Sequence, residues 1–505
     1  MFKNPGTPSE RRHVHKRVAL CRKILRLWKN IRLKKMRLKR SSMKIHICLF
    51  LGMLGILLLS PLAHAQDEIR DISRLKQDHF VYLSGKSDDS AIVDREIQQT
   101  LNESFSRRYF SVWQQEKPRC TRDDILWDFN KYGANPGYGE NHRRHEPAWV
   151  EALRHSAGLD QYPNRGIRGI TVANTDLRAL PTSGPLFDGL DNDSGYPFDR
   201  LQISTITVNS PVYISHVGED KDWVHVETGT YFGWVSARDV VPVDDDLANF
   251  WQSGRYAVVI RDRIPIYDEK GRFCFKAPLG AQFPLIREGV DFWEIRIVVP
   301  DQNGQAVSKV ARLGREHAAL RPLKMTRANL ARVANELINQ PYGWGGLYGN
   351  RDCSSMLMDF FAPFGIWLPR NSKQQAHETG RFIDLGNLSP EEKEAAILSS
   401  GIPYATLIWR KGHIMLYMGS FEGKALIFHN MWGVTTQDVR GRRGRRIVGR
   451  SVITTLRPGI ECCSGLAPGC DPLQSILGMT LLLPDAPKLP EPGPSPQPFP
   501  PLTNP

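Results

Sequence analysis

The sequence predicts an α+β protein in which two small β-barrels lie between a mainly helical N-terminal region and a mixed domain near the C-terminus. Residues 66–185 combine short amphipathic helical stretches, such as Ile92 to Tyr109, with polar loops. Residues 186–246 and 250–322 carry short strands separated by turns. Residues 325–455 contain both helical and strand periodicity, which is typical of an α+β unit. A chain of 505 residues has room for these domains.

The net charge of +14 is concentrated at the N-terminus. Residues 1–42 carry 15 basic side chains and one acidic side chain, so the rest of the chain is neutral overall. A general basic bias, the signature of a nucleic-acid-binding protein, is therefore missing from residues 43–505. We expect no nucleic-acid partner for the mature protein.

A secretion signal is predicted at residues 43–65. The stretch begins with Met43 and Lys44, continues as an apolar run from Ile47 to Leu62, and ends in Ala63-His64-Ala65. This order of basic start, short apolar core and small residues is that of a signal peptide. The mature chain would begin at Gln66, without a membrane span, in the periplasm or cell envelope. The basic leader 1–42 either lies upstream of the true start, is a long basic n-region of the signal peptide, or is a short basic arm that touches anionic lipid or nucleic acid.

The two predicted barrels share an internal pattern. Val212 to Ile214 precedes the strand that begins at Trp223, and Phe283 to Ile286 precedes the strand that begins at Trp293. We expect these two tryptophans in the cores and Tyr231, Phe232 and Trp234 as the better surface candidates. The ending Gly233-Trp234-Val235 resembles bacterial SH3 domains that accompany cell-wall hydrolases. Such domains would bind wall polymer, close one end of a cleft or act as spacers.

A cysteine follows a glycine-rich loop in the last domain. The loop reads Tyr342-Gly-Trp344-Gly-Gly, and Asp352-Cys353-Ser354-Ser355 follows it. Apolar residues then recur at helical spacing, so a buried helix is expected to begin near Cys353. The positive end of a helix dipole favours a thiolate, which is the nucleophilic form of cysteine.

Two histidines are expected on neighbouring strands after this helix. His413 alternates with apolar residues in one strand, and His429 lies in the next, beyond a turn centred near Phe421. Such a hairpin places the histidines opposite each other, within about one residue of register. Cysteine, base and orienting group form a generalised catalytic triad. The alternatives are a buried structural cysteine, a zinc site, or Asn430 in place of His429.

These segments closely resemble the NlpC-type bacterial cell-wall peptidases, which are papain-like. The matching motifs are Tyr342-x-Trp344-Gly-Gly, Asp352-Cys353-Ser354, Leu368-Pro-Arg370-x-Ser372-x-x-Gln375, Gly412-His413 and His429, within residues 325–455. The resemblance implies a thiol endopeptidase with no cofactor and no metal. Its substrates would be peptidoglycan stem peptides or muropeptides, cut between γ-D-glutamate and a diamino acid where the N-terminal L-alanine is free.

The resemblance also implies a role for each matching residue. Cys353 would attack, His413 would act as base and His429 would orient it. Asp352 would bind the substrate amine, Tyr342 would help to hold the oxyanion with the Cys353 N–H, and Ser354 would contact substrate, with Trp344 nearby. Alternatively, Asp352 caps the helix, and the two loop aromatics serve packing. Arg370, Ser372 and Gln375 are expected to be structural.

Two other functions remain compatible with the sequence: a non-catalytic wall-binding protein, and a papain-like amidase or acyltransferase. Residues 456–505 are predicted to be a tail that contains cysteines and is rich in proline, with Cys462 or Cys463 able to pair with Cys470. The arginine-rich segment Arg440 to Arg450 is predicted to be a solvated loop. Sequence alone does not determine the oligomeric state.

Overall fold

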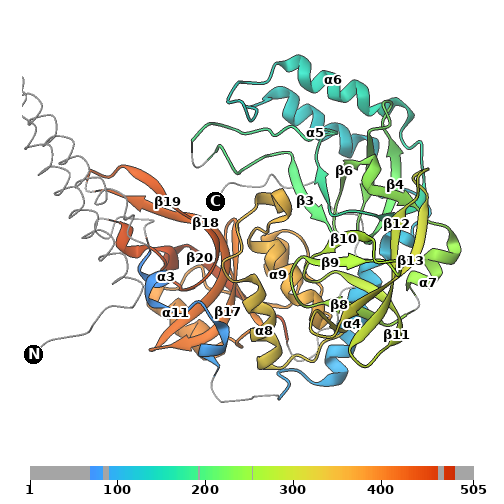
Figure 1. Cartoon of the computed structure of the whole chain (residues 1–505). Coiled ribbons are helices and arrows are strands. Elements are labelled where there is room, and N and C mark those ends of the chain that lie inside the picture. The colour runs from blue at the N-terminus through green and yellow to red at the C-terminus, as the bar shows by residue number, and fades with distance from the viewer. Residues whose placement is uncertain are drawn as a thin grey trace, which may run out of the picture. The chain divides into compact units, whose positions relative to one another are not determined.

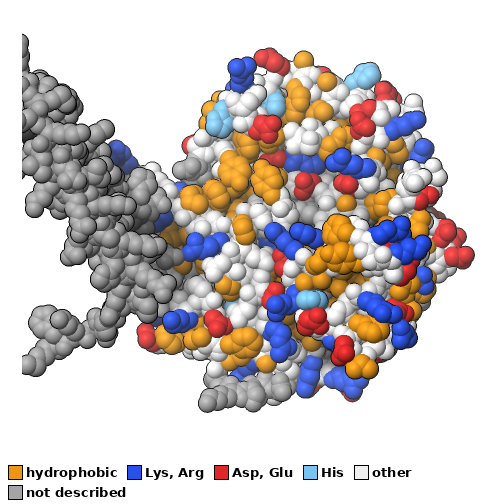
Figure 2. All heavy atoms as spheres, in the orientation of Figure 1, with side chains coloured by type: hydrophobic (Ala, Val, Ile, Leu, Met, Phe, Trp, Pro, Cys, Tyr) orange, Lys and Arg blue, Asp and Glu red, His pale blue; other side chains and the backbone are white. Residues whose placement is uncertain are grey.

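The computed structural model describes residues 69–83, 90–191, 194–252, 254–438, 440–463 and 471–483. The predicted leader and signal peptide and the proline-rich end of the tail lie outside these ranges. None of the helices in the described ranges has the length and apolar character needed to cross a membrane. On the face drawn in Figure 2, basic and acidic side chains are interspersed, as the neutral composition after residue 42 predicts.

The N-terminal region is helical, as predicted, and its segments pack on different parts of the chain. The helices are α3 (Arg70–Arg74), α4 (Arg95–Tyr109), α5 (Arg122–Ala134) and α6 (Pro147–Ala157). Helices α5 and α6 pack on each other and share a core with the first β-domain (Figure 1). This core includes Phe129, Val150 and Trp234. Segment 69–83 instead packs on the C-terminal domain, where His79 Nδ1 lies 2.9 Å from the Tyr404 hydroxyl.

The first β-domain is a seven-stranded antiparallel sheet with the order β3-β2-β6-β5-β4-β1-β7. Its strands are β1 (Ile167–Thr171), β2 (Thr175–Arg178), β3 (Gln202–Ile206), β4 (Pro211–Val217), β5 (Trp223–Glu227), β6 (Phe232–Ser236) and β7 (Val240–Pro242). Strands β1 and β2 fall within the region predicted to be helical. They belong to the sheet because β1 pairs with β4 on one side and β7 on the other, and β2 pairs with β3 and β6.

The second β-domain has a five-stranded sheet, β13-β12-β11-β8-β14, and a separate hairpin of β9 and β10. Its elements are α7 (Asp245–Gln252), β8 (Tyr256–Val259), β9 (Ile264–Tyr267), β10 (Phe273–Ala277), β11 (Gln282–Glu288), β12 (Phe292–Pro300), β13 (Ala306–Gly314) and β14 (Ala318–Leu320). The order of strands in both domains is open, so hydrogen bonding between the described strands does not close either predicted barrel.

The tryptophan and tyrosine predictions for these domains are partly wrong. Trp293 is buried, as expected, whereas Trp223 is only partly buried. Tyr231, Phe232 and Trp234, the expected surface candidates, are all less than 9% exposed. They are buried because α5 and α6 cover one face of this sheet and the C-terminal domain contacts the Tyr231 hydroxyl through Gln374.

The C-terminal domain packs helices against a six-stranded sheet with the order β15-β20-β16-β17-β18-β19. The helices are α8 (Arg327–Leu337), α9 (Cys353–Phe361), α10 (Ser372–Glu378) and α11 (Pro390–Ser400). The strands are β15 (Arg381–Asp384), β16 (Thr406–Arg410), β17 (His413–Phe421), β18 (Lys424–Gln437), β19 (Arg443–Thr455) and β20 (Ile476–Leu481). Helices α8 and α9 share one core with β16, β17 and β18.

Two predictions for the end of the chain need correction. Strand β20, inside the predicted tail, lies between β15 and β16 in the sheet, because its apolar run fills a gap that no earlier segment fills. Most of the predicted arginine-rich loop forms the start of β19, paired with β18. Cys463 is disulfide-bonded and Cys462 is free; Cys470 lies outside the described ranges.

Candidate active site

Cys353 is the first residue of α9, as the sequence predicted. Asp352 caps the helix, since its side chain accepts the Ser355 backbone N–H at 2.9 Å while the Ser355 hydroxyl accepts the Asp352 N–H. This capping box explains why the helix begins at the cysteine. It leaves the sulfur at the positive end of the helix dipole, above the β17–β18 part of the sheet.

The glycine-rich loop before Cys353 docks against strand β3 of the first β-domain. Gly345 and Gly346 have φ values of +61° and +92°, which side chains other than glycine rarely adopt. Their carbonyls accept hydrogen bonds from Gln202 Nε2 at 3.1 Å and Thr205 Oγ1 at 3.0 Å. A Cβ atom on Gly345 would lie 2.6 Å from the Gln202 carbonyl oxygen. The neighbouring domain therefore fills the space beside these two glycines.

His413 and His429 meet on the same face of the β17–β18 pair. His413 Nε2 lies 2.9 Å from His429 Nδ1. The two residues are diagonal rather than directly opposite. The hairpin turns between Phe421 and Lys424, later than expected, and a bulge between Tyr417 and Gly419 shifts the register back by one residue, so that the pairing of Leu416 with Phe428 continues to Met415 opposite His429. The register prediction was wrong by two residues, an even number that keeps both side chains on the same face.

Thr454 completes this chain of hydrogen bonds and was missed by the sequence analysis. Its hydroxyl lies 3.1 Å from His429 Nε2 and donates its proton to the Thr455 carbonyl at 2.8 Å. A hydroxyl that already donates must accept from the ring, so His429 carries its proton on Nε2. His429 Nδ1 then accepts from His413 Nε2–H, which leaves His413 Nδ1 as the lone-pair nitrogen available to a thiol.

The sulfur of Cys353 lies next to this relay. The backbone N–H of Ile414, the residue after His413, donates to it. Cys353 is 7% exposed, and burial together with the Asp352 carboxylate raises its pKa to about 12. Burial and the Arg410 guanidinium lower the pKa of His413 well below its ordinary value. The closed site therefore favours a neutral thiol beside a neutral imidazole, in contrast to the thiolate expected from the helix dipole.

Asp352 and Ser354 belong to a buried network centred on Arg370. The guanidinium contacts the Asp352 carboxylate at 2.5 and 3.1 Å, the Ser354 hydroxyl at 2.8 Å and Ser204 of the first β-domain at 2.9 Å. Gly345 N–H, the Ser355 hydroxyl and the Ser354 hydroxyl also donate to Asp352. Burial raises the pKa of Asp352, but Arg370 outweighs it and holds that pKa below its ordinary value. The carboxylate is thus fully occupied, which favours capping over amine binding.

The two loop aromatics have different surroundings. Trp344 is buried, donates its indole N–H to the Asp199 carbonyl at 3.0 Å and packs on Phe198, so it joins the first β-domain to the loop. Burial, and then the neighbouring Cys353 and Asp352, raise the pKa of the Tyr342 hydroxyl. A phenol with a raised pKa keeps its proton and is able to donate it in a hydrogen bond.

Comparison with known proteins matches four segments of the chain to family models. Residues 46–162 match the N-terminal stabilising domain of NLPC_P60, and residues 339–445 match the NlpC/P60 family. Residues 185–236 match an SH3 domain of the SH3b1 type, and residues 244–289 match one of the SH3b2 type. No curated protein matches the chain.

A solved NlpC/P60 endopeptidase from Photobacterium damselae subsp. piscicida is 27% identical to the chain. The alignment covers 81% of this chain and 97% of that one, with a TM-score of 0.73. A NlpC/P60 family protein from Bacillus cereus ATCC 10987 is 18% identical over 56% of this chain and 83% of that one, with a TM-score of 0.39. The predicted fold class is confirmed, and the chain carries a stabilising N-terminal domain, two SH3 domains and, at residues 339–445, a domain of the NlpC/P60 family.

Proposed function

We propose that this protein is a cysteine endopeptidase that hydrolyses peptidoglycan stem peptides in the periplasm or cell envelope. The observation that carries the proposal is the ordered chain from His413 through His429 to Thr454, next to a cysteine at a helix N-terminus. The chain leaves one unprotonated imidazole nitrogen for the thiol. The similar endopeptidase from Photobacterium and the family of this domain support the reaction class.

In the proposed reaction, the Cys353 sulfur attacks the substrate carbonyl carbon while its proton passes to His413 Nδ1. Because the proton moves while the sulfur attacks, neither the Cys353 thiol nor the His413 imidazole has to be charged in the buried site before the reaction. The Tyr342 hydroxyl and the Cys353 backbone N–H would stabilise the oxyanion. His413 then protonates the departing amine. Water, activated by the same nitrogen, would hydrolyse the thioester and restore the thiol.

The bond we propose is the one between γ-D-glutamate and the diamino acid, in peptides with a free N-terminal L-alanine. The motif resemblance supports this choice. The contact between the Cys353 loop and strand β3 adds support, since a first SH3 domain fixed there would limit the length of substrate beyond one end of the cleft. Because Asp352 is already occupied by Arg370, amine binding at Asp352 would require that ion pair to open.

Defined stem peptides incubated with the mature protein, with products identified by mass spectrometry, test the proposal. We expect cleavage after γ-D-glutamate by the native protein and none by a Cys353→Ala variant. Identical products from both proteins would refute a thiol mechanism. Binding to purified sacculi without turnover would support a wall-binding protein instead, and an acyl-enzyme resolved by an added amine would indicate an acyltransferase.

A further inference from the structure

A cation that has no counter-ion among the described residues lies beside His413. Arg410 ends β16, and a two-residue turn, Lys411-Gly412, joins it to His413 at the start of β17. The two residues are directly paired across the strands. Directly opposed residues in antiparallel strands point to the same face, with Cβ atoms about 4.5–5.5 Å apart. The guanidinium of Arg410 therefore starts from the face that carries the His413 imidazole.

The buried arginines Arg351 and Arg370 of this domain hold carboxylates, whereas the half-buried Arg410 holds none from the described residues. Arg351 pairs with Asp262 and Asp359, and Arg370 pairs with Asp352. Within the described part of the chain, Arg410 makes no ion pair. Burial lowers the pKa of its guanidinium, and the neighbouring groups that act on this pKa are the Cys353 thiol and another cation, Arg445. A half-buried guanidinium without an anion is costly unless a ligand supplies one.

The direction of proton transfer indicates which part of the substrate faces Arg410. His413 must reach the nitrogen of the departing amine, so the leaving residue lies on the His413 side of the sulfur. Arg410 shares that side through the β16–β17 pairing. Diaminopimelate and lysine, the two common diamino acids at this position, differ in one respect: diaminopimelate carries a carboxylate at the end of its side chain.

We propose that Arg410 binds the side-chain carboxylate of the leaving residue and so selects diaminopimelate over lysine. This proposal rests on the proposed function. A guanidinium presents parallel N–H donors that match a carboxylate, and such charge-assisted hydrogen bonds are about twice as strong as neutral ones. Lysine would leave the guanidinium unpaired and place a second positive charge near it.

The test compares two stem peptides that differ only in the diamino acid, which is diaminopimelate in one and lysine in the other. Both peptides end in D-alanine, so the α-carboxyl of the diamino acid is amide-bonded in both. For the native protein we expect kcat/KM for the diaminopimelate peptide to be higher by about tenfold or more. In Arg410→Gln this ratio should fall close to one, with the rate on the lysine peptide retained. Arg410→Lys should keep part of the preference.

Lys411→Gln is the matched control, because it removes an exposed positive charge from the same turn. It should leave the preference unchanged. An equal fall on both peptides in Arg410→Gln, or an unchanged ratio, would overturn the proposal and make Arg410 a structural support for His413. Failure of the native protein to cleave either peptide would instead refute the proposed function, so the two failures are distinguishable.

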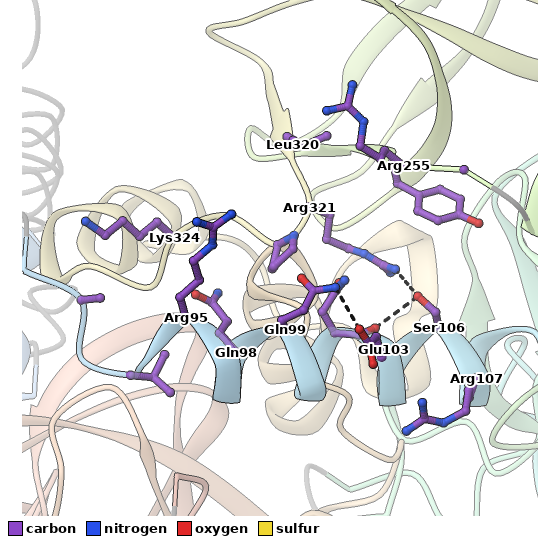
Figure 3. Close-up of a pocket in the computed structure, with 16 residues that line it drawn as sticks. Arg95, Gln98, Gln99, Glu103, Ser106, Arg107, Arg255, Leu320, Arg321 and Lys324 are labelled. Carbon is purple, nitrogen blue, oxygen red and sulfur yellow. Dashed lines mark hydrogen bonds between the residues drawn. The ribbon is translucent and has the colours of Figure 1, made fainter.

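A second inference comes from a separate cavity of about 1010 Å³ between α4 and the second β-domain. Figure 3 shows α4 along one side, with Arg95 near one end and Arg107 near the other, and Arg255 and Arg321 facing it. Arg107 follows Arg95 by twelve positions in the helix, a rise of about 18 Å. The helix contributes amide and hydroxyl groups between them, including Gln99 and Ser106.

The lining of the cavity carries an excess of positive charge, although one of its cations, Arg255, is paired with Glu288 at 2.5 Å. Glu103 is the one acidic residue in its described lining, and Gln99 donates to it. Arg321 is only 6% exposed and donates to the neutral groups of Gln282 and Ser106. Its Nε atom has no partner among the described residues, and no carboxylate of that part of the chain pairs with it. Cations spread along a groove, with amides between them, suit an elongated ligand with several negative charges rather than one small ion.

We infer that this groove binds an acidic saccharide chain. Fluorescence anisotropy with labelled oligogalacturonate tests the inference, with a sulfated heparin oligosaccharide, a neutral cello-oligosaccharide and a single-stranded DNA oligomer as further probes. We expect both acidic saccharides to bind, the neutral one not to bind, and a double Arg95→Ala, Arg107→Ala variant to bind about tenfold more weakly. A double Arg143→Ala, Arg238→Ala variant removes two exposed charges elsewhere and should bind normally.

Three results would overturn this inference. They are equal binding of the neutral saccharide, equal weakening in both double variants, and tighter binding of the DNA oligomer than of either acidic saccharide. The first would indicate uncharged sugar contacts, the second a general charge effect, and the third a nucleic-acid site. Because both variants change exposed side chains away from Cys353, peptide cleavage should not change.

Discussion

Replacing Thr454 with valine tests the direction of the proton relay. Valine keeps the shape of threonine but removes the hydroxyl that accepts from His429 Nε2–H at 3.1 Å. His429 is 1% exposed, so water does not easily replace the lost acceptor. The competing arrangement, in which His429 Nδ1–H donates to His413 Nε2, would then become more populated. In that arrangement His413 Nδ1 carries a proton and has no lone pair for the Cys353 thiol.

The structure sets the size of the expected effect. One neutral hydrogen bond to a buried ring contributes about 1 kcal/mol, so losing it should lower kcat/KM by about fivefold. The unsatisfied ring N–H and the Thr455 carbonyl, which loses a donor, should reduce the free energy of unfolding by about 1–3 kcal/mol. The Michaelis constant should change little, because Thr454 lies behind both histidines and not against the cleft.

Two measurements on the same proteins check this reasoning: kcat/KM on a stem peptide, and nitrogen-15 NMR of the imidazoles to read which ring nitrogen is protonated. Thr454→Ser keeps the hydroxyl and should restore both. Thr480→Val is the matched control, since Thr480 is a buried threonine of the same sheet that bonds the Ala376 carbonyl and not a histidine. Native tautomers and native kcat/KM in Thr454→Val would refute the relay.

Three further predictions follow from the surroundings of buried groups. Because burial raises the pKa of Cys353 to about 12, its alkylation by iodoacetamide in the free protein should still increase above pH 9, whereas a plateau near neutral pH would indicate a thiolate. Arg370→Met should lower the free energy of unfolding, measured by urea titration, by about 3–5 kcal/mol, because the Asp352 carboxylate stays buried without its cation. An additional Asp352→Asn change should recover part of this loss. Burial lowers the pKa of three histidines, His79, His225 and His429, to about 3. Each of them favours the unfolded state as the pH falls below 6.5, and together they should lower the free energy of unfolding by about 4 kcal/mol at pH 5.5. Equal urea midpoints at pH 7.5 and 5.5 would contradict this.

Local patterns predicted the elements of the candidate site well. Asp352, Cys353 and Ser355 specify a capped helix start by themselves, since a capping box depends on residues three apart. The alternation around His413 and His429 predicts two strands with both imidazoles on one face. The register of those strands was beyond the sequence, because it depends on a bulge next to Gly419, whose φ of +120° is not visible in a pattern of apolar residues.

Predictions failed where burial depends on another part of the chain. Tyr231, Phe232 and Trp234 were the better surface candidates from the sequence. They are buried because distant helices and the C-terminal domain cover them. Strand β20 was assigned to a tail because a run of apolar residues after a cysteine-containing loop does not indicate which sheet has a gap for it.

The sequence by itself determined the chemical groups available to this protein: a cysteine at a helix start, two histidines on adjacent strands, and four consecutive domains. These features depend on residues close together in the chain, and periodicity and capping preferences report them directly. The tertiary structure decided what each group does. Thr454 orders the imidazole protons, Arg370 occupies Asp352, and Arg410, beside His413, meets no anion from the part of the chain that the structure describes. Those outcomes depend on contacts between distant segments, which determine the partners and the burial of each charge.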